Sequence, residues 1–95
     1  MPVTMIVHFK VKKDKQAEFS NIMDSVKIDL PSIDGCINVS IYKNMTKPQN
    51  YTLVETWGSR ERHEQYVNDL IESGSWGDIS ALLEKEPLSD YFDVY

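Results

Sequence analysis

Four stretches of the chain alternate apolar and polar residues with the period of two that is typical of β-strands. They run from Val3 to Val11, Cys36 to Met45, Asn50 to Ser59 and Tyr91 to Tyr95. A proline-containing loop, Thr46 to Asn50, separates the second and third stretches and favours a hairpin. The pattern therefore predicts four strands, the third of which leads directly into a helix.

Two further segments repeat apolar residues at the spacing of three and four positions that marks a helix. The first follows Asp14, an N-cap candidate, and ends at Pro31. The second is capped by Ser59, breaks at Ser73-Gly74-Ser75 and resumes at Trp76 as a short third helix. The order β-α-β-β-α-β predicts a ferredoxin-like α+β fold, with a four-stranded antiparallel sheet and helices on one face.

The two faces of the predicted sheet differ in the residues that they carry. The more apolar face is expected to meet the helices, and it holds Val3, Met5, Val7, Phe9, Ile37, Val39, Ile41, Val54, Phe92 and Val94. The other face is rich in large rings, and it holds Ile6, Cys36, Tyr42, Tyr51, Leu53, Trp57, Tyr91 and Tyr95. These rings are too many to remain in water once both helices are used on the first face. We therefore expect a homodimer that packs sheet against sheet into an α+β barrel.

Composition narrows the range of partners. The 95 residues are expected to form a single domain, 1–95, with 15 acidic and 10 basic residues and a net charge of −5. The chain has no stripe of basic residues of the kind that binds nucleic acid. It also has no apolar run near the ~20 residues that a membrane span needs. The lone Cys36 and the lack of a signal-peptide pattern favour the cytoplasm. The two histidines lie far apart in the sequence, so we expect no metal.

Two motifs carry a resemblance to a known family. They are Ile33-Asp34-Gly35-Cys36 before the second strand, which contains Tyr42, and above all the run from Val54 to Glu61, in which Glu55 and Trp57 precede a capped helix. From Met5 to Tyr95 the chain resembles the antibiotic biosynthesis monooxygenase family of the dimeric α+β barrel superfamily. The resemblance implies small dimers that oxygenate anthrones or quinols with molecular oxygen and without a prosthetic group. Relatives degrade haem, isomerise small phosphorylated metabolites or have no established activity.

The chain departs from the family pattern at several positions. Ser75-Trp76 stands where many members have His-Phe or His-Met, and Leu53 stands where some aromatic oxygenases have an asparagine. The haem-degrading branch has Asn, Trp and His where this chain has Val7, Tyr66 and Ser80. These differences disfavour haem degradation and weaken the anthrone-type interpretation.

Cofactor-free oxygenation needs a base, a group that stabilises the resulting anion, and a dry apolar slot. His8 is the candidate base, because histidine changes charge near neutral pH. Tyr42 and Trp57 are candidates for catalytic stacking and hydrogen-bond donation. Tyr66, Trp76 and Glu55 complete the expected pocket, where Glu55 would orient His8 or pair with a cation across the dimer. Each of these six residues has packing or dimer formation as its structural alternative.

His63 and Cys36 are expected to have no catalytic part. His63 is placed at the surface of the second helix, and Cys36 has no basic neighbour in sequence to activate its thiol. The leading hypothesis is thus a cofactor-independent monooxygenase acting on a small aromatic or quinol-like substrate. The alternatives are a non-enzymatic small-molecule-binding or stress-related dimer on the same scaffold, and a haem-binding or isomerase relative.

Overall fold

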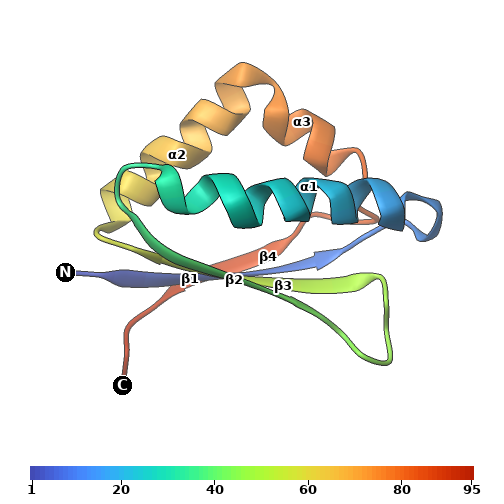
Figure 1. Ribbon diagram of the computed structural model, residues 1–95, viewed down its shortest axis with the longest axis horizontal. Helices are drawn as coiled ribbons and strands as arrows, with labels where there is room; N and C mark the ends of the chain where they lie inside the picture. The colour runs from blue at the N-terminus through green and yellow to red at the C-terminus, as the bar shows by residue number, and fades with distance from the viewer.

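The strands and helices follow the predicted order and form two layers (Figure 1). In the computed structural model, which describes residues 1–95, the elements are β1 Val3–Lys10, α1 Gln16–Asp29, β2 Cys36–Lys43, β3 Asn50–Trp57, α2 Arg60–Ser73, α3 Ser75–Ser80 and β4 Leu88–Phe92. The sheet is antiparallel with strand order β2-β3-β1-β4, and all three helices lie over one of its faces. The predicted ferredoxin-like α+β fold is confirmed.

The ends of several elements differ from the sequence prediction. Strand β4 begins directly after Pro87 and ends at Phe92, three residues earlier than expected. It pairs antiparallel with β1, from Leu88 opposite His8 to Phe92 opposite Thr4. Only one residue of β1 lies beyond Thr4, so β1 offers almost no partner for the residues after Phe92. Asp14 does not cap α1, because it lies in a short 3-10 turn and α1 begins without a side-chain cap.

The start of α2 matches the prediction. The Ser59 side chain accepts a hydrogen bond from the backbone N–H of Arg62 at 3.3 Å, which is the expected N-cap. Gly74 ends α2 in the left-handed conformation at φ 85° and allows the sharp turn into α3.

The predicted sheet faces were wrong for β3 and for part of β4. Residues directly opposite each other in a sheet point to the same face. Met5 lies opposite both Glu55 and Tyr91, and because Met5 faces the helices, the alternate residues of β3 and Tyr91 face them too. The residues wrongly placed on the outer face are therefore Tyr51, Leu53, Trp57, Cys36 and Tyr91, whereas Val54 and Phe92 belong to the outer face.

A bulge explains the remaining error in β2. The pairing shifts between Cys36, opposite Trp57, and Asn38, opposite Thr56, so Ile37 is left outside the regular alternation and is 59% exposed. Val39 and Ile41 lie beyond the bulge and face the helices as predicted.

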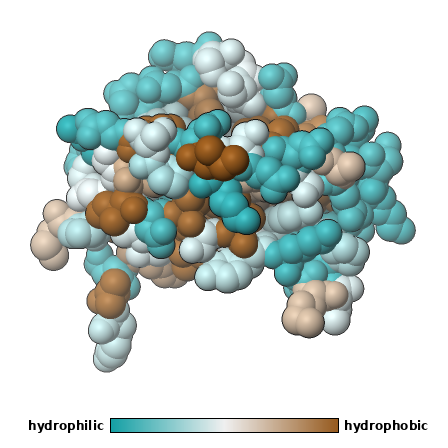
Figure 2. Space-filling view, viewed as in Figure 1, coloured by the Kyte–Doolittle hydropathy of each residue, from teal (hydrophilic) through white to brown (hydrophobic).

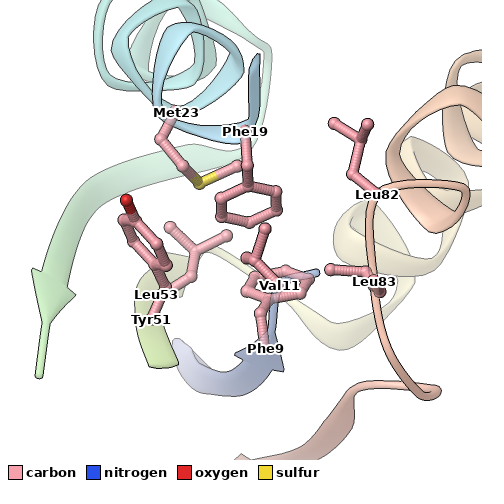
Figure 3. Packing of buried hydrophobic residues seen from close by; sticks show 8 residues of the cluster. All are labelled: Phe9, Val11, Phe19, Met23, Tyr51, Leu53, Leu82 and Leu83. Carbon is pink, nitrogen blue, oxygen red and sulfur yellow. The ribbon is translucent and has the colours of Figure 1, made fainter. Parts of the chain in front are cut away.

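The main core fills one end of the layer between helices and sheet (Figure 3). Phe19 of α1 lies at its centre, with its ring centroid 5.3 Å from that of Phe9 and 4.9 Å from that of Tyr51. The other members are Val11, Met23, Leu53, Leu82 and Leu83. Hydrophilic side chains cover most of the helical side, and hydrophobic ones show through between them (Figure 2). None of the helices has the length and apolar character to cross a membrane.

Candidate functional site

An apolar cavity lies between the helices and the sheet, beside the main core. Its volume is about 180 Å³, and eleven of the fifteen residues that line it are hydrophobic. The walls come from β1, β3, α1, α2 and α3, and Tyr66 and Trp76 are among them. The polar side chains Glu55 and His63 also reach this cavity. A largely apolar cavity with a few convergent polar groups is the usual form of a small-molecule site.

Glu55 places an ionisable group in this apolar environment. It is 3% exposed, and its Oε1 accepts a hydrogen bond from Trp57 Nε1 at 2.7 Å. Burial raises the pKa of the Glu55 carboxyl above its ordinary value, and the Trp57 hydrogen bond opposes this rise only in part. The second oxygen, Oε2, accepts no hydrogen bond from the chain. Every side-chain oxygen that is completely buried has a partner, so Oε2 is not completely buried. Oε2 is therefore open to the cavity that Glu55 lines.

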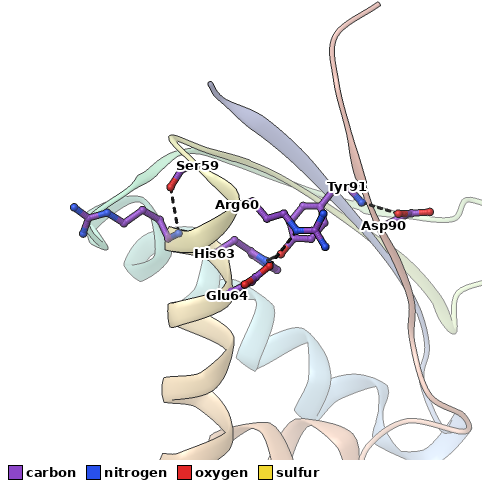
Figure 4. Close-up of polar contacts among 7 residues, drawn as sticks. Ser59, Arg60, His63, Glu64, Asp90 and Tyr91 are labelled. Carbon is purple, nitrogen blue, oxygen red and sulfur yellow. Dashed lines mark hydrogen bonds and ion pairs between the residues drawn. The ribbon is translucent and has the colours of Figure 1, made fainter.

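His63 stands next to Glu55 and belongs to the first turn of α2, where Figure 4 shows it beside Tyr91. Its Nε2 is 3.8 Å from Glu55 Oε1, and its Nδ1 is 2.7 Å from the Tyr91 hydroxyl on β4. Burial lowers the pKa of His63, although nearby Glu64 acts in the opposite direction. The imidazole is therefore neutral at neutral pH. The expectation that His63 lies at the surface was wrong, since the residue is only 6% exposed.

Aromatic rings surround this acid and imidazole. Trp57 is fully buried, with its ring centroid 5.3 Å from that of Tyr66 and 5.5 Å from that of His63. Burial raises the pKa of Tyr66 to about 12, and Glu55 and Cys36 add to this rise, so the hydroxyl keeps its proton at neutral pH. Trp76 is partly buried and forms part of the cavity wall. The rings of Tyr66 and Trp76 suit the flat face of an aromatic compound, whereas Trp57 is not among the residues that line the cavity.

His8 and Tyr42 lie on the opposite face of the sheet, so the expectation of one pocket for all six candidates was wrong. His8 pairs with Thr52 across β1 and β3, and its Nδ1 is 3.0 Å from Thr52 Oγ1. Both candidates line an open groove of about 410 Å³ on the face that the helices leave bare. The groove is separated from Glu55 by the sheet itself, because His8 and Glu55 belong to opposite faces. Glu55 consequently cannot orient His8.

The residues that the sequence prediction missed are His63 and Tyr91. His63 is three positions before Tyr66 on the same helix, so the two side chains share one helical face, and this spacing was the available signal. Tyr91 could not be found, because its position depends on the register of β4 against β1.

Cys36 and possible metal ligands complete the inventory of reactive groups. The Cys36 thiol is half-buried and donates to the Asn38 carbonyl at 3.8 Å. Burial and the nearby Glu55 raise the pKa of this thiol, which keeps it in the unreactive protonated form. No three His, Cys, Asp or Glu side chains are grouped as metal ligands would be.

The fold and the cavity define a small α+β protein with a buried acid in an apolar site beneath its helices. The sequence profile described as "Antibiotic biosynthesis monooxygenase" matches residues 2–69. The chain belongs to the antibiotic biosynthesis monooxygenase family.

Individual proteins are similar to the chain in sequence or in fold. An uncharacterised protein of Synechocystis sp. is 29% identical in an alignment 76 residues long, which covers 75% of this chain and 52% of that protein. The chain thus spans about half the length of this curated relative. Among solved structures, a conserved protein from Methanosarcina mazei is similar with a TM-score of 0.84 at 22% identity, covering 97% of this chain and 91% of that one.

A further structural relative has a described activity. SnoaB, a cofactor-independent oxygenase from Streptomyces nogalater whose structure was solved as a mutant, is similar with a TM-score of 0.81 at 15% identity. The similarity covers 98% of this chain and 92% of that chain. At these identities the structural similarity establishes the shared fold.

Proposed function

We propose that the protein is a cofactor-independent monooxygenase that oxidises a small aromatic or quinol-like substrate in the cavity between helices and sheet. The observation that carries the proposal is the free Oε2 of Glu55, a carboxylate oxygen with a raised pKa that opens on an apolar, ring-lined cavity. Membership of the monooxygenase family and the fold shared with a cofactor-independent oxygenase support it.

The proposed reaction uses Glu55 as the acid–base group and the apolar cavity as the site where the substrate meets O₂. Glu55 takes a proton from an activated CH₂ carbon of the substrate, as in the keto form of a quinol, and leaves a carbanion. The carbanion gives its electrons to O₂ and forms a C–O bond, and Glu55 returns the proton to the distal oxygen to make a hydroperoxide. Loss of the second hydrogen as a proton, with cleavage of the O–O bond, gives a carbonyl and one water. The sum, R₂CH₂ + O₂ → R₂CO + H₂O, needs no further reductant.

The surrounding residues have supporting parts in this proposal. The Trp57 N–H fixes the carboxyl group so that Oε2 faces the substrate, and Tyr66 and Trp76 hold the substrate ring. The Tyr66 hydroxyl remains a donor at neutral pH and can stabilise the carbanion's charge once it has spread to an oxygen.

The size of the cavity limits the substrate. At about 180 Å³ it is close to the ~150 Å³ apolar cavity that holds benzene and below the roughly 300 Å³ of typical drug-sized sites. We therefore propose a substrate of one or two rings.

Oxygen uptake by purified variants tests the proposal. With one- and two-ring quinols we expect Glu55→Gln to lower kcat by about 10²- to 10⁴-fold, the usual contribution of a general base. The matched control Glu72→Gln alters an exposed glutamate of α2 and should retain full activity. Loss of activity in His8→Ala with an active Glu55→Gln would instead assign the reaction to the groove on the open face.

The alternative functions have their own signatures in the same assay. A thermal-shift screen with quinols, anthrones, flavins and haem, run with and without oxygen, precedes the uptake measurement. A stabilising compound that consumes no oxygen would contradict the monooxygenase and favour a binding protein or an isomerase. A Soret band on haem titration would favour the haem-binding relative.

We further propose that residues 1–95 act as one domain and that the protein is a cytoplasmic homodimer joined through the open face of the sheet. Apolar side chains on this face support the dimer, among them Leu88 at 67% and Phe92 at 46% exposure. The free thiol of Cys36 suits a reducing compartment.

A further inference from the structure

A series of side chains in contact, Glu55, His63 and Tyr91, connects the buried carboxyl group to the protein surface. Glu55 Oε1 lies 3.8 Å from His63 Nε2, and the other ring nitrogen of His63 lies 2.7 Å from the hydroxyl oxygen of Tyr91. Glu55 and His63 are 3% and 6% exposed, so neither group meets bulk water directly. The only polar group that contacts Nδ1 of His63 belongs to Tyr91, on the edge strand of the sheet.

Tyr91 is the member of this series that reaches the protein surface. Figure 4 shows it between His63 and Arg60. It is only partly buried, and the exposed Arg60 guanidinium lies over its ring, 4.5 Å from the centroid. Arg60 is held there by a 3.0 Å hydrogen bond from its Nε to Glu64 Oε1. Burial, assisted by Glu64, raises the pKa of Tyr91, so its hydroxyl carries a proton at neutral pH and can both accept and donate one.

We propose that Glu55, His63 and Tyr91 form a proton path between the cavity and the surface. The inference rests on the proposed function, in which Glu55 returns its first proton to the peroxide and takes the second as the O–O bond breaks. That second proton leaves by the path, and the released hydroxide meets a proton in the solvent as water, so Glu55 is again a carboxylate for the next turnover. Once the Glu55 carboxyl group turns so that its protonated oxygen faces His63, the proton passes to Nε2 of His63, the proton on Nδ1 passes to Tyr91, and the hydroxyl proton of Tyr91 passes to water. Glu55 ends as the carboxylate, one proton poorer, and His63 and Tyr91 each end with the number of protons they had at the start after the imidazole and hydroxyl reorient.

The geometry fits this transfer at each step. The 2.7 Å contact between His63 and Tyr91 is a short hydrogen bond. The 3.8 Å gap between Glu55 and His63 closes to a hydrogen bond when either side chain moves by about 1 Å, and such contacts are commonly long before substrate binds. The titratable and charged groups that surround the His63 ring are Glu55, Tyr91, Glu64, Arg60 and Tyr66. Among them, Glu55 and Tyr91 contact its two nitrogens.

Replacing Tyr91 by phenylalanine removes one hydroxyl and retains the ring. We expect Tyr91→Phe to lower kcat of oxygen uptake by about tenfold to 10²-fold, at the lower end of what one proton-transfer group contributes. KM should not change, because Tyr91 does not line the cavity. Added imidazole, a small proton carrier, should restore part of kcat. The matched control Tyr95→Phe alters a tyrosine in the exposed tail and should match the wild type.

The outcomes separate the path from a structural role. An unchanged kcat in Tyr91→Phe, or a lowered kcat that imidazole does not restore while thermal unfolding stays normal, would overturn the path. If the wild-type protein consumes no oxygen with any quinol, the proposed function fails, and the path is judged by hydrogen exchange at the His63 ring in ¹⁵N NMR. Slower exchange in Tyr91→Phe than in Tyr95→Phe supports the path, and equal or faster exchange overturns it.

Discussion

Glu55 carries a carboxyl group into surroundings that disfavour its charge. One hydrogen bond from Trp57 and the neutral ring of His63 are its polar neighbours, and the remaining contacts line an apolar cavity. Burying an ionised carboxylate is costly unless it is paired, so the group responds with a raised pKa. The same property makes Glu55 a stronger base than an exposed glutamate and a source of instability in the fold.

This conflict predicts a pH-dependent gain of stability in Glu55→Gln. The folded protein holds the Glu55 proton more tightly than the unfolded chain does, so the free energy of unfolding falls as pH rises from about 4.3, the ordinary pKa of glutamate, through the folded pKa. At pH 7.5 we expect the variant to be the more stable of the two proteins, because its neutral amide has no charge to bury. At pH 4 the gain should vanish.

Urea unfolding of both proteins at the two pH values measures this difference. Burial lowers the pKa of His63, so the folded protein binds the His63 proton less tightly than the unfolded chain does. The free energy of unfolding therefore falls as pH drops below about 6.5, the ordinary pKa of histidine. At pH 7.5 His63 is neutral in both proteins, so their difference at that pH reports on Glu55. Equal stability at pH 7.5 would show that the Glu55 carboxyl is not held in an unfavourable environment.

At the level of elements, α2 is fixed against the loop that precedes β2, and this contact holds His63 above Glu55. Arg62 forms an ion pair with Asp34 at 2.5 Å, and the Gly35 carbonyl accepts a hydrogen bond from the Gly58 N–H at 2.7 Å. Gly35 has φ +93°, and a Cβ atom there would lie 2.7 Å from Arg62 Cβ. The turn therefore requires glycine for both its backbone conformation and its close approach to α2.

A pair of glycine substitutions tests this contact. We expect Gly35→Ala to lower the free energy of unfolding by about 2 kcal/mol, within the range for a strained left-handed residue. Gly77→Ala should raise it by roughly 0.5–1 kcal/mol, because Gly77 lies inside α3 with open space around it and alanine favours helix. Thermal or urea unfolding measures both. A Gly35→Ala protein as stable as wild type would show that α2 can shift away from the loop.

The strands and helices could be predicted from the sequence, whereas only some of the residues around the cavity could. Periodicity located the strands and helices because burial on one face sets the spacing of apolar residues. The face of β3 was misjudged on account of Glu55, although Tyr51, Leu53 and Trp57 on the same side are all buried. An acid among large apolar residues at alternate positions marked a buried ionisable group. Its partner Tyr91 depends on strand register, which no local pattern records.

At the scale of the whole molecule, the open face of the sheet lacks a covering layer. Its apolar residues are Ile6, Tyr42, Val54, Leu88 and Phe92, and Ile6 lies directly opposite Val54 at the centre of the sheet. All three helices lie over the other face, and the hydrophobic side chains of this one are part of an apolar surface of the kind that marks an interface. A second copy of the chain, packed sheet against sheet, would bury these residues in both subunits.

A charge at the centre of this face should therefore separate the proposed dimer. Light scattering of the wild type should give about twice the 11.0 kDa of one chain. Val54→Lys would place an unpaired ammonium group in the interface, at a cost of several kcal/mol, and should yield a folded monomer. Ile28→Lys, on the exposed side of α1, is the matched control and should remain dimeric. A monomeric wild type, or a Val54→Lys protein that stays dimeric, would require another explanation for the apolar residues of the open face.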